Sequence, residues 1–246
     1  MPGRRSASRG VTLLEMLVAV TLLGLLSGGI LLALHAGVNA MGKARAKLMD
    51  NRRMAGVQRI MEQQIAGFVP VLAQCQPQQG TLPASLPFFQ GEPQSMRFVS
   101  SFSLAEGWRG RPLILEFQVI PGELGAGVRL VVNELMYAGP QTAGASCTGL
   151  VRDDTAGVMV PMFRPIAVGP QSFVLADRLS FCRFSFMEQS ANPPVSRWVS
   201  RWILPRWPSA VRIEMAPLEA DAVRLRPLTL TAPVRVTAEP GRNYER

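Results

Sequence analysis

Histidine is almost absent from this sequence. The single histidine, His35, lies in an apolar run near the N-terminus, which leaves none for a Ser-His-Asp, Cys-His or histidine metal site in the rest of the chain. No GxSxG, phosphate-binding loop or helix-opening GxGxxG motif occurs. The adjacent Asp153 and Asp154 supply too few oxygens for calcium. We therefore predict no enzyme, no catalytic residue, no metal and no cofactor, although folding can still bring two carboxylates together.

Cysteine is also scarce, and its spacing is uninformative. The three cysteines, Cys75, Cys147 and Cys182, are odd in number and form no CxxC, so neither a zinc site nor a redox motif is indicated. One disulfide can form if the domain is exported to an oxidising compartment. The sequence does not decide the pairing. Cys147 with Cys182 is one candidate pair, and three buried thiols are the alternative.

Lysine is the third scarce residue, because only Lys43 and Lys47 occur among 26 basic residues. The net charge of +9 therefore comes from arginines, most of which are scattered through segments that resemble strands. A basic balance is compatible with nucleic acid or an anionic membrane. Scattered arginines instead indicate the solvated outer face of a sheet, so we predict no nucleic-acid partner.

One long apolar run dominates the N-terminal part of the chain. No formally charged side chain lies between Met16 and Gly42, which exceeds the roughly 20 residues that a membrane-spanning helix needs. The run is too long for the apolar region of an ordinary secretory signal. Arginines precede it, so we expect a single-pass anchor with a cytoplasmic N-terminus.

Glu15 lies at the start of this run. A carboxylate in or near hydrocarbon is costly and normally has a partner or a function. The alternative is that Glu15 lies at the headgroup boundary and is solvated there.

The same run contains Gly24 and Gly28, a small-xxx-small spacing that lets helices approach closely in lipid. The alternative is that these glycines have no specific packing role, because glycine is common in membrane helices.

The letters GVTLLE, which begin at Gly10, follow the basic leader MPGRRSASRG and open the apolar run. Together these features resemble the type IV prepilin processing motif. The resemblance implies that prepilin peptidase cleaves after Gly10 and methylates Val11, which stands where the family usually has phenylalanine. It also implies that Glu15 neutralises the N-terminal amine of a neighbouring subunit. Opposite charges attract strongly in a low dielectric, where each alone is costly.

The chain after the apolar run predicts one amphipathic helix and then antiparallel strands. Apolar residues recur every three or four positions from Met54 to Phe68, and Pro70 ends the pattern. Residues 70–94 are expected to be a loop, and 138–178 are irregular. Several of the predicted strands alternate in polarity, and Pro233 suits only an edge strand. These strands are Met96–Ser103, Leu113–Ile120, Val128–Tyr137, Leu179–Met187, Arg197–Ile203, Ala210–Met215 and Leu228–Val236.

The predicted fold class is therefore α+β, with a long N-terminal helix packed on an antiparallel sheet, as in pilins. We divide the chain into a leader (1–10), a transmembrane and assembly half of the helix (11–42), an amphipathic half (43–69) and a β-rich globular domain (70–246). The resemblance places this protein in the bacterial inner membrane, with the globular domain in the periplasm.

A narrower resemblance lies near the C-terminus. The strand Leu179–Met187, Trp198 and Trp202, and the stretch LPRWPSAVRI from Leu204 are similar to J-type minor pseudopilins of type II secretion. That family implies a structural subunit at the tip of the pseudopilus that helps initiate its assembly for protein export. It implies I- and K-type minor pseudopilins and the major pseudopilin as partners. The alternatives are a minor pilin of a type IV pilus and, from another class, a membrane-anchored periplasmic enzyme or binding domain.

Overall fold

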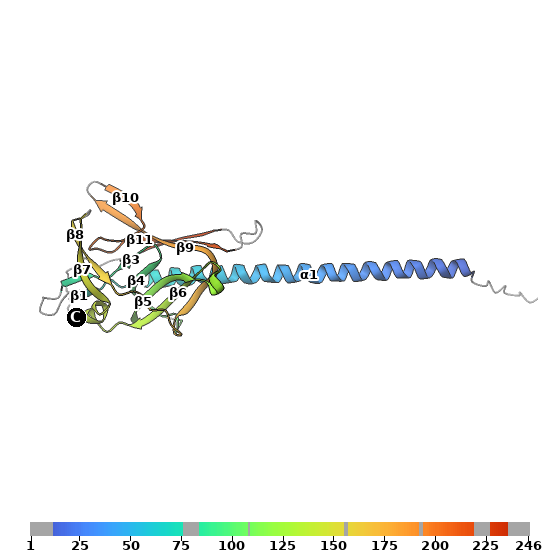
Figure 1. Ribbon diagram of the computed structural model, residues 1–246, viewed down its shortest axis with the longest axis horizontal. Coiled ribbons are helices and arrows are strands. Elements are labelled where there is room, and N and C mark those ends of the chain that lie inside the picture. Colours follow the sequence, from blue (N-terminus) through green and yellow to red (C-terminus); the bar gives the residue numbers. More distant parts are fainter. Residues whose placement is uncertain are drawn as a thin grey trace, which may run out of the picture. The chain divides into compact units, whose positions relative to one another are not determined.

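The computed structural model describes residues 12–75, 84–107, 109–154, 157–191, 194–218 and 227–235. The chain divides into two compact units, Met1–Asp50 and Asn51–Arg246, and each is described by itself. Helix α1 (Leu13–Ala66) contributes residues to both (Figure 1). In the first unit the helix has no break at Gly37–Gly42, because no proline interrupts it and strong helix formers surround the glycines.

The second unit is built around one antiparallel sheet. Its strands lie in the order β12–β11–β9–β6–β5–β4–β3, and β10 pairs with β9 outside this path (Figure 1). The bounds are β3 (Gln90–Gly91), β4 (Ser95–Phe102), β5 (Arg109–Pro121), β6 (Val128–Met136), β9 (Phe173–Ala191), β10 (Pro194–Val199), β11 (Ala210–Pro217) and β12 (Leu228–Pro233). A short 3-10 helix, η1 (Glu123–Gly125), joins β5 to β6. The α+β class predicted from the sequence is confirmed.

The stripe of apolar residues on α1 covers one face of this sheet. Val57, Met61 and Ile65 are buried, and they belong to the same core as Phe98 and Phe117. Alternation along β11 buries every second side chain on this face, as its sequence predicts. The edge position expected from Pro233 is also confirmed, since β12 ends the sheet and Pro233 is its last residue.

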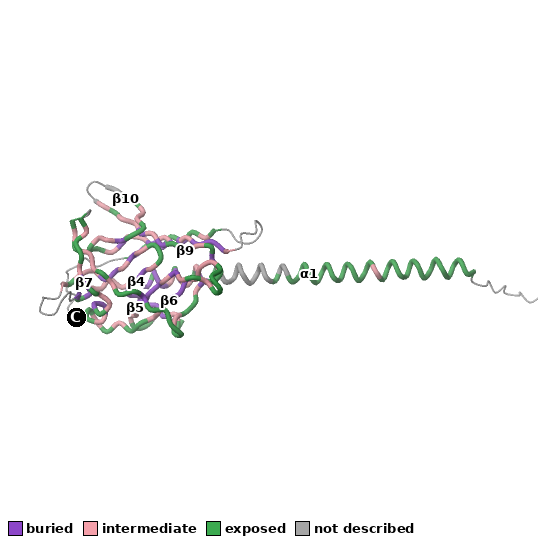
Figure 2. Tube along the Cα trace, viewed as in Figure 1, coloured by how far each residue is buried: buried purple, intermediate pink, exposed green. Residues whose placement is uncertain are grey.

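The opposite face of β4 and β5 is covered by a second, smaller layer. Val99 and Ile114 are cross-strand partners that point away from the α1 side, and both are buried in a separate cluster. The covering elements are β1 (Leu72–Cys75), β2 (Ala84–Pro87), α2 (Pro140–Gly144), β7 (Cys147–Asp153) and β8 (Val158–Phe163). Because both faces are covered, β4 is buried almost throughout, as Figure 2 shows.

This second layer corrects two expectations from the sequence. The segment 70–94 is not only a loop, because it forms the β1–β2 hairpin and β3. The segment 138–178 is not irregular throughout, because it contains α2, the β7–β8 hairpin and the start of β9. Short strands with proline at Pro87 and Pro161 lack the length and alternation by which strands are recognised in a sequence.

Strand ends also differ from those predicted. Strand β9 begins at Phe173, several residues before the predicted Leu179, and β10 covers Pro194–Val199 instead of Arg197–Ile203. Trp202, which falls outside β10, makes an isolated bridge to Gly91. The last residue of the predicted strand Leu228–Val236 lies outside the described residues.

Candidate functional site: the N-terminal helix

The first turn of α1 is closed by a side-chain cap. The hydroxyl of Thr12 accepts a hydrogen bond from the backbone N–H of Glu15 at 3.3 Å, and the carbonyl of Thr12 accepts one from Met16 at 3.2 Å. Thr12 and Glu15 therefore have the spacing of a capping box. An acidic residue in the first turn also complements the positive end of the helix dipole.

The carboxylate of Glu15 makes no ion pair with any residue that the structure describes. Its backbone N–H is already satisfied by Thr12, so Glu15 is fixed at the start of the helix with its charged group exposed. An exposed carboxylate beside a long apolar surface is expected to pair with a cation in a low-dielectric setting.

The helix beyond Glu15 is apolar around its whole circumference. The described side chains from Leu13 to Gly42 are almost all exposed, including Leu25 at 75% and Leu32 at 75% (Figure 2). This segment is long and apolar enough to cross a membrane. A helix that is apolar all round is buried in lipid or against other helices. The segment is therefore a candidate single-pass anchor.

The two glycines singled out from the sequence lie one turn apart on this helix. A Cβ added at Gly24 or Gly28 would meet nothing within 4 Å, so both positions are open. Their backbone is available for close approach by another helix. Packing through Gly24 and Gly28 stays a prediction. Gly10 and Val11, the predicted processing residues, lie outside the described residues.

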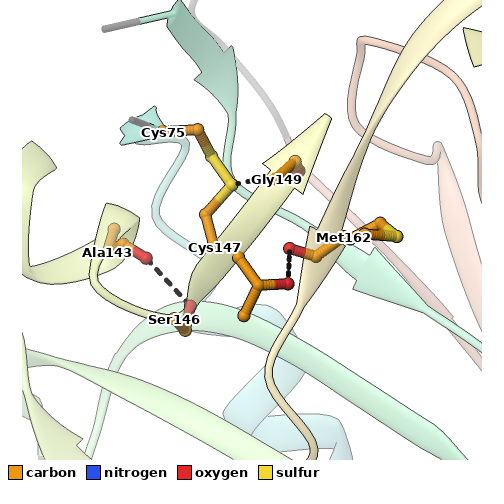
Figure 3. Close-up of a disulfide and its surroundings, with 7 residues drawn as sticks. Cys75, Ala143, Ser146, Cys147, Gly149 and Met162 are labelled. Carbon is orange, nitrogen blue, oxygen red and sulfur yellow. Dashed lines mark hydrogen bonds between the residues drawn. A yellow bond between two sulfur atoms is a disulfide. The ribbon is translucent and has the colours of Figure 1, made fainter. Parts of the chain in front are cut away.

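The predicted cysteine pairing is wrong. Cys75 on β1 is joined to Cys147 on β7 (Figure 3), with a Cα–Cα distance of 5.5 Å. Cys182 is a free, buried thiol. Cys182 points into the core on the α1 side of the sheet, whereas Cys147 packs with the layer on the opposite face. The sheet therefore separates Cys147 from Cys182. Burial raises the pKa of the Cys182 thiol to about 12.

A buried charge network was not found by sequence reasoning. Arg97 on β4 and Glu116 on β5 are cross-strand partners, and their side chains form an ion pair at 2.8 Å with Arg97 only 1% exposed. Arg97 also donates to the Gln90 side chain and to the carbonyl of Arg164. Asn133 donates to Glu116 at 3.2 Å. In the sequence, Arg97 and Glu116 are polar residues in predicted strands, a pattern typical of a solvent-exposed face. The sequence does not reveal that a second layer covers this face and buries the pair.

Comparison with known proteins identifies the N-terminal segment. Residues 5–31 match the family model described as the prokaryotic N-terminal methylation motif, which is the signal of type IV pilins. This motif supports a type IV pilin-like protein or pseudopilin. No curated protein matches the chain. The matched residues include the whole GVTLLE stretch and the first half of the apolar helix.

Proposed function

We propose that this chain is a filament-assembly subunit, and specifically a J-type minor pseudopilin at the tip of a type II secretion pseudopilus that helps initiate its assembly. One observation carries the class: a methylation motif runs directly into a helix that is apolar all round. The α+β fold is compatible with it, since α1 ends against an antiparallel sheet. We propose no enzymatic activity.

The proposed mechanism is packing of α1 against the helices of other subunits. Leu13–Gly42 would exchange lipid for neighbouring helices, and Gly24 and Gly28 would allow close approach. Glu15 would set the register, because its carboxylate gains a partner only where a neighbour's new N-terminal amine lies opposite. Thr12 supports this role by capping the helix and holding Glu15 in the first turn.

The finer assignment rests on the C-terminal stretch. After β9 and β10, Trp202 is buried, and its indole N–H donates to the carbonyl of Arg206 at 2.6 Å. Trp202, one of the residues on which the J-type resemblance rests, therefore packs in the core of the globular unit. By resemblance, the proposed partners are I- and K-type minor pseudopilins, the major pseudopilin and prepilin peptidase.

We further propose that the helix anchors the chain in the bacterial inner membrane with its N-terminus in the cytoplasm. The globular domain would then lie in the periplasm. The Cys75–Cys147 disulfide supports this placement, since disulfides persist in oxidising compartments.

Mass spectrometry of the N-terminus tests the class. The mature chain, isolated from membranes of a cell that has prepilin peptidase, is expected to begin at methylated Val11. In a strain without the peptidase, it is expected to retain Met1–Gly10. A mature chain that begins at Met1, or beyond the apolar run, would refute the proposal.

The role of Glu15 is tested by Glu15→Ala with Glu106→Ala as the control, since Glu106 is an exposed acid in the globular unit. Membrane insertion should survive in both variants. Cross-linking to other subunits and protein secretion should be lost only in Glu15→Ala. Normal secretion with normal cross-linking would contradict the charge-pairing role, and defective piliation with normal secretion would favour the type IV pilus instead.

A further inference from the structure

Two polar side chains lie within the apolar segment Leu13–Gly42 of α1. They are His35 and Asn39, one turn apart, and both are exposed. Neither side chain forms a hydrogen bond with any residue that the structure describes. Thr21 differs, because its hydroxyl donates to the carbonyl of Val18 at 2.9 Å. In lipid, His35 and Asn39 would therefore lack hydrogen-bond partners, which is costly.

His35 belongs to a row of positions that recur in alternating steps of four and three residues. Because α1 is continuous through this segment, positions at such a spacing share one face of the helix. A Cβ added at any glycine of the row would meet nothing within 4 Å. Asn39 borders the row one turn after His35. We call this row the seam, and its members are Leu17, Thr21, Gly24, Gly28, Leu31, His35, Val38 and Gly42.

The spacing of the seam fits one kind of helix pair. A repeat that averages 3.5 residues makes two helices coil left-handedly at roughly 20°, so they stay in contact over several turns. The glycines let the two backbones approach closely. The next position of the row is Arg45, so the seam ends where the apolar segment ends. At about 100° per residue, Glu15 lies on the far side of the helix from the seam.

A second copy of this chain is the partner that matches the seam. A neutral imidazole and an amide each carry a donor and an acceptor, so both groups can bond to their own copies. Two copies inserted in the same orientation are parallel, which places equivalent polar groups at the same depth. In coiled coils, a polar side chain at one seam position specifies the register and the number of strands. An apolar partner helix would leave His35 and Asn39 unsatisfied.

We propose that this chain forms a parallel homodimer in the membrane through the seam, with His35 and Asn39 hydrogen-bonded between the two copies. The inference rests on the proposed membrane anchor, but not on processing, on Glu15 or on type II secretion. Because Glu15 faces away from the seam, the homodimer leaves it available for the amine of another subunit. The two contacts therefore use different faces of one helix.

Oxidative cross-linking locates the contact. The full-length chain is produced in a host without a type II secretion system or pilus, and isolated membranes are oxidised. Leu31→Cys, on the seam, should give disulfide-linked dimers on non-reducing gels. Leu26→Cys, on the far side of the helix, should give no more than the unaltered chain, which supplies the baseline for the native cysteines.

Sedimentation equilibrium of the full-length chain in detergent micelles measures the strength of the contact. Gly28→Leu should weaken dimerisation about tenfold, as should His35→Leu combined with Asn39→Leu. Gly37→Leu is the matched control, because Gly37 is equally open but lies on the far side of the helix. His35→Gln keeps a donor and an acceptor, so it should dimerise as the unaltered chain does.

Several outcomes would overturn the inference. Equal cross-linking at positions 26 and 31, or equal weakening by Gly28→Leu and Gly37→Leu, would show that the seam is not the contact. A membrane-bound monomer would show that water at the membrane surface satisfies His35 and Asn39. Dimers that form only with a co-expressed pilin-like subunit would make that subunit the partner. A monomer that still begins at methylated Val11 in its own cell would leave the proposed function intact, whereas recovery outside membranes would overturn both.

Discussion

Removal of one partner from the buried ion pair between Arg97 and Glu116 should strongly destabilise the globular unit. Both side chains are almost wholly removed from water, at 1% and 9% exposure, and their closest atoms are 2.8 Å apart. Desolvation lowers the pKa of Arg97, and the Glu116 carboxylate opposes that shift. Glu116→Gln keeps the size of the side chain, removes its charge and replaces one acceptor oxygen with an NH2 donor. It leaves Arg97 buried without a counterion, and either Arg97 or Asn133 without its acceptor.

The expected cost follows from this geometry. Breaking a buried ion pair by removing one partner costs about 3–5 kcal/mol. Glu116→Gln should fall at the lower end, since the amide oxygen can still accept from Arg97. The matched control is Glu123→Gln, which breaks the pair between Arg129 and Glu123. The Glu123 side chain is 75% exposed, so this change should cost far less than Glu116→Gln.

The free energy of unfolding can be measured with urea, by tryptophan fluorescence, on the full-length chain in detergent micelles. The double variant Arg97→Met/Glu116→Leu should be more stable than Glu116→Gln, because it leaves no unpaired charge. It should not exceed the unaltered chain by much, since Gln90 and Asn133 each lose a hydrogen-bond partner. A loss below about 1 kcal/mol for Glu116→Gln, similar to that of Glu123→Gln, would refute the reasoning.

Three further predictions concern the cysteines and one glycine. Cys75→Ser should destabilise the globular unit by about 2–5 kcal/mol in urea unfolding, because it removes the link to Cys147. Iodoacetamide should modify Cys182 only in denaturant, as read by mass spectrometry, because its pKa of about 12 keeps the buried thiol protonated at neutral and mildly alkaline pH; rapid native labelling would contradict this. Gly91→Ala should cost about 1–3 kcal/mol, because its Cβ would lie 2.7 Å from a buried phenylalanine ring. Gly169→Ala, where a Cβ meets nothing within 4 Å, should cost little, and equal losses at the two glycines would contradict the steric argument.

Much of the large sheet could be predicted because the sequence patterns that indicate its strands lie within short runs of consecutive residues. The alternation of apolar and polar residues along Ala210–Met215 specifies which side chains of β11 are buried. Strand β11 pairs with β9 in the sheet. The spacing of Met54, Val57, Met61 and Ile65 likewise specifies one face of α1. The predicted helix extended to about Val69, but α1 ends at Ala66, and Phe68 instead forms an isolated bridge with Ser100. These patterns are properties of a few consecutive residues, so they are readable before the fold is known.

The second layer could not be predicted, since its stability comes from contacts between distant segments. Strand β1 and strand β7 are brought together by a disulfide that spans 72 residues of sequence. The β7–β8 hairpin is short, contains Pro161, and leaves Val151, Met159 and Met162 exposed, so its strands lack clean alternation.

The sequence by itself determined the membrane-length apolar helix and the methylation motif, because a membrane span and a short motif depend only on consecutive side chains. The tertiary structure decided which cysteines meet and which charged pair is buried. Those features depend on which face of the sheet each side chain occupies and on what covers that face. Cys147 and Cys182 illustrate the difference: the sequence left them as one candidate pair, but they lie on opposite faces of the sheet, and Cys147 is bonded to Cys75.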